Sequence, residues 1–173
     1  MGCGKSSVGR RLSELLCCSF MDLDDVIVER AGRSIPEIFE TDGEAVFRQM
    51  EHDALQDIIA SAERHSTIVL ALGGGAVMQE ECERMVHEGT VCIYLKASVD
   101  TLLSHLEGEA AGRPLLNNTP VMSSEVETYH LRNRIFNLMA KRSATYERTA
   151  HHIIDTDGKT VEDIATEIIE ILF

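Results

Sequence analysis

Short apolar runs alternate with longer amphipathic segments along this chain, and this alternation limits the possible folds more than any other feature. The clearest run, residues 67–72, ends in three consecutive glycines, and its uninterrupted apolar character predicts a strand buried on both faces. Strands are expected at Ser19–Met21, Thr67–Leu72, Val91–Leu95 and His151–Asp155. Helices are expected from about Gly43 to Arg64, from about Glu125 to Thr149, and after Thr160. The pattern predicts an α/β fold with a parallel sheet covered by helices on both faces, and we expect residues 1–173 to form a single domain.

A candidate phosphate-binding loop opens the chain. Gly2-Cys3-Gly4-Lys5-Ser6-Ser7 matches the second half of the motif G-x-x-x-x-G-K-[ST]. Glycines let backbone N–H groups turn toward a phosphate, and the N-terminal end of the following helix attracts negative charge. Lys5 can bridge the β- and γ-phosphates of a nucleotide, and the Ser6 hydroxyl can ligate Mg²⁺. The alternative is a helix N-terminus with a flexible tail, which this short motif alone does not exclude.

Two carboxylates follow the first expected strand, in Asp22-Leu23-Asp24. If the segment is extended, alternation places Asp22 and Asp24 on the same side, facing one site beyond the carboxyl end of the strand. One carboxylate can then hold a Mg²⁺-bound water while the other accepts a proton from a substrate hydroxyl. The alternative is a helix start, since Asp22, Asp24 and Asp25 all suit a helix N-terminus.

Arginines and glycines supply candidate anion-binding groups. Arg48, on the long helix, can grip a substrate carboxylate with its guanidinium fork, or it can simply pair with Glu51 on a helix surface. Three consecutive glycines, Gly73-Gly74-Gly75, lose much backbone entropy on folding. Their presence is therefore better explained by the close approach of a ligand than by a simple turn. Arg142, in Lys141-Arg142 followed by Tyr146, is either a further anion contact or ordinary helix surface.

Residues 108–124 are polar, contain Gly and Pro and show no periodicity. Such a segment is typical of a mobile lid, and it carries Arg113, a cation that can close over ATP and neutralise charge developing at the γ-phosphate. The alternative is a solvated loop charge.

Composition excludes several classes of partner. The chain has 16 Lys and Arg against 29 Asp and Glu, a net charge of −13, which opposes binding to a nucleic-acid backbone. No apolar run approaches the roughly 20 residues that a membrane helix needs. The five cysteines are odd in number and no two are spaced as C-x-x-C, which favours a reducing, cytoplasmic location over a disulfide framework or a zinc site.

Taken together and in order, these motifs resemble the shikimate kinase family over essentially the whole chain. The matching motifs are Gly2–Ser7, Asp22-Leu23-Asp24, Phe47-Arg48 with Glu51, Gly73-Gly74-Gly75, Arg113-Pro114-Leu115, and Lys141-Arg142 with Tyr146. The resemblance implies a P-loop kinase fold with strand order 2-3-1-4-5. It also implies ATP-dependent, Mg²⁺-assisted phosphorylation of the 3-hydroxyl of shikimate, a step of aromatic amino-acid (chorismate) biosynthesis.

The resemblance also implies a role for each matching residue. Lys5, Asp24 and Arg113 would be catalytic, and Ser6 and Asp22 would hold the metal. Shikimate would contact Asp24, Arg48, Arg142 and the backbone of Gly74. ATP would contact Arg113, Lys159 and the loop residues Gly2, Cys3, Gly4, Lys5, Ser6 and Ser7.

The chain departs from the family pattern at its start, where the strand before the loop and the first loop glycine are absent. Many family members have a Met immediately before the second loop glycine, so we expect Met1 to be an internal Met of a longer natural chain. Family members are usually monomers. Two alternatives stay open: a related P-loop kinase acting on another polyol acid such as gluconate, and a non-catalytic nucleotide-binding regulator.

Overall fold

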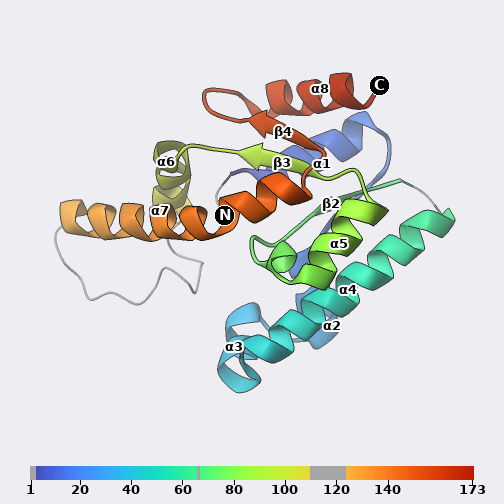
Figure 1. Cartoon of the computed structure of the whole chain (residues 1–173), viewed down its shortest axis with the longest axis horizontal. Coiled ribbons are helices and arrows are strands. Elements are labelled where there is room, and N and C mark those ends of the chain that lie inside the picture. Colours follow the sequence, from blue (N-terminus) through green and yellow to red (C-terminus); the bar gives the residue numbers. More distant parts are fainter. Residues whose placement is uncertain (1–2, 66, 110–123) are drawn as a thin grey trace.

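The computed structural model describes residues 3–65, 67–109 and 124–173, and Figure 1 shows short strands alternating with helices. The strands are β1 (Ser19–Asp22), β2 (Ile68–Ala71), β3 (Ile93–Lys96) and β4 (His152–Asp155). The helices are α1 (Lys5–Leu15), α2 (Leu23–Ala31), α3 (Ile35–Thr41), α4 (Gly43–His65), the 3-10 helix η1 (Ala76–Met78), α5 (Glu80–Gly89), α6 (Val99–Glu109), α7 (Ser124–Thr149) and α8 (Val161–Leu172). The strands and helices expected from the sequence are confirmed, with small differences at their ends.

The strands form two parallel pairs. β1 pairs with β2 in the register Ser19↔Ile68 to Asp22↔Ala71, and β3 pairs with β4 in the register Ile93↔His152 to Lys96↔Asp155. The expected order 2-3-1-4-5 counts the strand before the phosphate loop as strand 1. The pair β1-β2 therefore corresponds to its neighbouring strands 2 and 3, and the pair β3-β4 to its strands 4 and 5. Among the residues that the structure describes, no strand lies between β2 and β3, which is the place expected for the first strand.

Helices cover both faces of the strands, and alternate residues of a strand show this directly. Val69 of β2 packs with α1 and α8, whereas its neighbours Leu70 and Leu72 pack with α2, α4 and α5. β3 alternates in the same way, because Ile93 and Leu95 pack toward α1 and α8. The expectation of a sheet covered on both sides is therefore confirmed.

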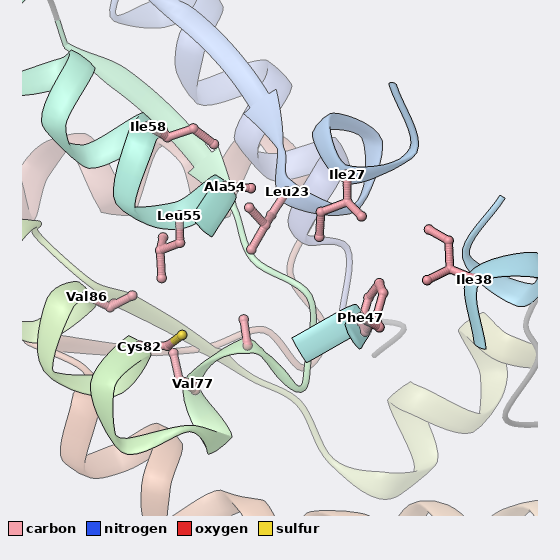
Figure 2. Packing of buried hydrophobic residues seen from close by; sticks show 11 residues of the cluster. Leu23, Ile27, Ile38, Phe47, Ala54, Leu55, Ile58, Val77, Cys82 and Val86 are labelled. Carbon is pink, nitrogen blue, oxygen red and sulfur yellow. The ribbon is translucent and has the colours of Figure 1, made fainter. Parts of the chain in front are cut away.

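The largest core cluster lies beneath α4. Figure 2 shows apolar side chains from α2, α3, α4, η1 and α5 pointing toward one another. Leu23, Ile38 and Leu55 of this cluster are fully buried. The cluster joins α4 to α2, which carries Asp24, and to η1, which follows Gly73-Gly74-Gly75 (the glycine turn). Packing therefore holds these parts of the site together.

Side-chain caps explain several helix starts. The Thr160 hydroxyl accepts from the Asp163 N–H while Asp163 accepts from the Thr160 N–H, a capping box that opens α8 as expected. Ser34 and Glu37 form the same arrangement at α3, a helix that the sequence analysis did not assign. Its signal was present, because Ser34 and Glu37 have capping-box spacing and Pro36 lies in the first turn.

Within the described part of the chain, none of the helices is both long enough and apolar enough to cross a membrane.

Candidate active site

The loop before α1 has the geometry of an anion-binding helix start. Gly4 has a left-handed backbone with φ of 75°, which favours glycine, and its carbonyl accepts from the Val8 N–H. Gly4, the N-cap of α1, has no side chain with which to cap the helix, and the first turn of α1 carries no acidic residue. The first N–H groups of the helix can therefore bind phosphate. Gly2, also assigned to the loop, lies outside the described residues.

Lys5 lies beside Cys3, and both line a cavity. Its Nζ atom is 3.7 Å from the Cys3 Sγ atom. Burial alone would raise the pKa of the Cys3 thiol, but the positive charge of Lys5 is the main opposing influence, and the pKa lies below its ordinary value. Both residues line a cavity of about 100 Å³ that extends between the end of β2 and β3.

Ser6 and Asp22 form a pair of oxygen ligands. The Ser6 hydroxyl donates to Oδ2 of Asp22 at 2.6 Å, and Oδ1 of Asp22 accepts from the Asp24 N–H at 3.1 Å. A hydroxyl and a carboxylate are ligands that suit Mg²⁺, which usually takes one or two protein carboxylates and completes its shell with water and phosphate. The predicted metal ligands therefore fit a nucleotide-bound Mg²⁺.

Asp24 is placed by a helix and not by an extended segment, so the expected extended segment is wrong and the alternative, a helix start, is confirmed. Asp22 is the N-cap of α2, and Leu23 already begins the helix. The carboxylate of Asp22 caps the helix by accepting from the Asp24 N–H, as Asp commonly does at an N-cap. Asp24 still faces the site: a Cβ atom built on Gly73 would stand 2.7 Å from its Oδ1 atom.

Arg48 is held by a buried carboxylate. It donates through Nη1 to Glu51, and through Nη2 to Oε1 of Glu44 at 3.0 Å. The pairing of Arg48 with Glu51, which the sequence offered only as an alternative, is present, but it does not lie on a helix surface, because Glu51 is only 1 % exposed. Burial raises the pKa of Glu51, the nearby Asp24 carboxylate adds to this, and Arg48 opposes it.

Glu51 is a residue whose importance the sequence understated. It lies on the same face of α4 as Phe47, Ala54, Leu55 and Ile58, all of which are buried. That position was the available signal, since a buried Glu needs a cation or hydrogen-bond donors. Its role here is to hold the guanidinium of Arg48 in place.

Arg142 approaches the glycine turn from α7. Its Nη1 atom donates to the carbonyl of Gly74 at 3.0 Å, and the Tyr146 hydroxyl donates to the same oxygen. On the other side, a Cβ atom built on Gly75 would stand 2.5 Å from Nη1 of Arg48. The two arginines predicted to grip a carboxylate thus meet at Gly74-Gly75, one from α4 and one from α7.

Two predicted nucleotide contacts, Lys159 and Arg113, stay predictions. Lys159 donates to Oε2 of Glu167 on α8 at 2.5 Å, in an exposed pair, so its contact with ATP stays a prediction. Arg113 lies outside the described residues, as does most of the expected lid at 108–124, of which only the end of α6 and the start of α7 are described.

The fold and the site together define a class. Parallel strands covered on both faces, a glycine loop at a helix start, and a Ser–Asp pair at the carboxyl ends of the strands are the parts of a P-loop kinase, an enzyme that transfers phosphate from ATP with Mg²⁺. The family model for shikimate kinase matches residues 1–173. The chain belongs to the shikimate kinase family.

Individual relatives agree with this assignment. The chain is 42 % identical over 170 residues to the shikimate kinase of Geobacter sulfurreducens, covering 97 % of this chain and 84 % of that protein. It is 37 % identical over 172 residues to that of Dictyoglomus turgidum, covering 98 % and 91 %. Shikimate kinase from Acinetobacter baumannii, solved in complex with shikimate, is 31 % identical with a TM-score of 0.86, and the match covers 99 % of this chain and 88 % of that one.

Proposed function

We propose that the site of this chain transfers the γ-phosphoryl group of ATP to the 3-hydroxyl of shikimate. The observation that carries the proposal is the meeting of Asp24, Arg48 and Arg142 at the glycine turn, beside the Ser6–Asp22 pair. Shikimate offers both groups that such a site needs, a carboxylate for the arginines and a ring hydroxyl for Asp24. The solved relative from Acinetobacter baumannii binds shikimate, which supports the choice of substrate.

The loop before α1, together with the Ser6–Asp22 pair, binds ATP. N–H groups at the start of α1 donate to the phosphates, and Lys5 moves to the transferred group. Ser6 and Asp22 would hold Mg²⁺, which would supply positive charge to neutralise the β- and γ-phosphates. Arg113 and Lys159 complete the proposed ATP contacts, Arg113 by closing over the nucleotide.

The helix side of the site handles shikimate. Arg48, braced by Glu51, and Arg142, docked on Gly74, bind the substrate carboxylate with their remaining N–H groups. Asp24 orients the 3-hydroxyl and accepts its proton as the oxygen attacks the γ-phosphorus. The bond from that phosphorus to the bridging oxygen breaks, ADP leaves, and shikimate 3-phosphate remains.

A coupled ADP-release assay with matched acceptors tests the proposal. ATP and Mg²⁺ with shikimate should give turnover, while gluconate at equal concentration should give no more than the rate without acceptor. Turnover with gluconate and not with shikimate would assign the site to another polyol acid. Binding of ADP–Mg²⁺ in a thermal-shift assay without turnover on either acceptor would indicate a nucleotide-binding regulator.

We also propose that the enzyme works as a cytoplasmic monomer that binds neither nucleic acid nor membrane. The net charge of −13 and the five cysteines without C-x-x-C spacing support this. Sedimentation velocity with and without ATP and shikimate should give a single species of monomer mass. A concentration-dependent dimer would contradict it.

A further inference from the structure

Two side chains of α7 hold one carbonyl oxygen of the glycine turn. Arg142 donates to the Gly74 oxygen at 3.0 Å, and the hydroxyl of Tyr146 donates to the same atom. The two residues are four apart on the helix, so they share a face. A carbonyl oxygen has two lone pairs, and these two donors occupy both.

The turn depends on this contact because its own hydrogen bonds use other carbonyls. The Ala76 N–H donates to the Gly73 oxygen and the Met78 N–H to the Gly75 oxygen. The Gly74 oxygen is instead held from α7. Since the peptide is planar, fixing that oxygen also fixes the direction of the Gly75 N–H, at the residue that packs against Arg48.

A neighbouring tyrosine provides an internal comparison. The rings of Tyr94 and Tyr146 are in contact, with centroids 5.3 Å apart. Within the described residues the buried Tyr94 hydroxyl has no hydrogen-bond partner, and burial raises its pKa to about 12. In this ring pair the Tyr146 hydroxyl is hydrogen-bonded to the glycine turn, whereas the Tyr94 hydroxyl has no partner among the described residues.

We propose that Tyr146 is a positioning residue for the shikimate carboxylate. Its hydroxyl fixes the Gly74 carbonyl, which gives Arg142 a stationary acceptor and keeps the guanidinium turned so that its other N–H groups can face the substrate. Without the hydroxyl, the carbonyl is free to move and Arg142 loses its fixed orientation. This inference rests on the proposed role of Arg142 in binding shikimate.

The test compares Tyr146→Phe with Tyr94→Phe, which remove a hydroxyl from each member of the same ring pair. Tyr146→Phe should raise the KM for shikimate about fivefold to tenfold, the loss of about one hydrogen bond, with the KM for ATP and kcat changed less than about twofold. Tyr94→Phe should leave all three constants unchanged and should not lower the unfolding temperature, because it removes an unpaired buried hydroxyl.

Arg142→Ala and the double variant separate the possible failures. If Tyr146 acts through Arg142, Tyr146→Phe should add nothing to the KM of Arg142→Ala. An unchanged KM for shikimate in Tyr146→Phe, or an equal rise in both KM values, overturns the positioning role while Arg142 keeps its own. An unchanged KM in Arg142→Ala overturns the role of Arg142 in substrate binding and the positioning role with it.

Discussion

Gly75 and Arg48 are packed so closely that the glycine has no room for a side chain: a Cβ atom at Gly75 would stand 2.5 Å from Nη1, 2.8 Å from Nη2 and 2.9 Å from Cζ of Arg48. Gly73 also lies close to two carboxylates: a Cβ atom at Gly73 would stand 2.7 Å from Oδ1 of Asp24 and 3.2 Å from Oε1 of Glu51. The two glycines therefore pack against different charged groups. A substitution at each glycine tests the role of the group that it contacts.

Gly75→Ala should displace the guanidinium of Arg48 and raise the KM for shikimate about tenfold or more, with a small effect on the KM for ATP. The obstructing atoms are the far end of a flexible side chain, so the protein should still fold. Measured KM values in Gly75→Ala, Arg48→Lys and the double variant check the mechanism. If the methyl group acts by displacing the guanidinium of Arg48, it should cost little further once that guanidinium is absent; additive losses would contradict that explanation.

Gly73→Ala should instead lower kcat, because the new methyl group displaces Asp24. We expect a loss of about tenfold or more, with a smaller change in either KM. Comparing it with Gly75→Ala in one assay shows whether the two ends of the turn serve different steps. The same pattern of constants in both variants would mean that the turn acts only as a rigid unit.

The two arginines are expected to affect one substrate only. Arg48→Lys and Arg142→Ala should each raise the KM for shikimate about tenfold to a hundredfold, the cost of losing a charge-assisted contact. Lysine is used at position 48 because Arg48→Ala would leave the buried Glu51 without its cation. Arg148→Ala is the matched control for α7, since Arg148 is 63 % exposed and pairs with Glu83. The proposed carboxylate site is supported if all three variants bind ATP normally and only Arg48→Lys and Arg142→Ala bind shikimate more weakly.

Asp24→Asn should lower kcat by about a hundredfold or more while changing the KM for ATP little, because an amide cannot accept the proton of the attacking hydroxyl. Asp25→Asn is the control, since it is the next residue on α2 and its side chain is exposed. Single-turnover rates of phosphate transfer measure the effect on the chemical step. Near-normal rates in Asp24→Asn would leave it only a role at the start of α2.

The sequence predicted what depends on local pattern and missed what depends on long-range contacts. The helix at Gly43–His65 and the cap at Thr160 follow from periodicity and capping chemistry. For Asp22 and Asp24 the sequence allows either an extended segment or a helix start, and the structure shows the helix start, with Asp22 ending the strand and capping α2. The bond from Tyr146 to Gly74 joins residues 72 positions apart, and no local rule predicts which carbonyl a tyrosine will reach. Motif order supplied the arginines, but only packing shows that they meet at the same turn.

The remaining prediction concerns the space between β2 and β3, each of which is paired on one edge only within the described residues. Leu72 just after β2, Leu95 of β3 and Tyr146 of α7 are among the residues that line the cavity of about 100 Å³ there. Backbone N–H groups without a hydrogen-bond partner are protected from exchange less well than those in a ladder. We therefore expect the N–H groups on the edges of β2 and β3 that face this space to exchange with deuterium faster than the N–H groups bonded to β1 and β4. Hydrogen exchange followed residue by residue measures the difference. Equal protection on both edges of β2 and β3 would contradict an unpaired edge on each strand.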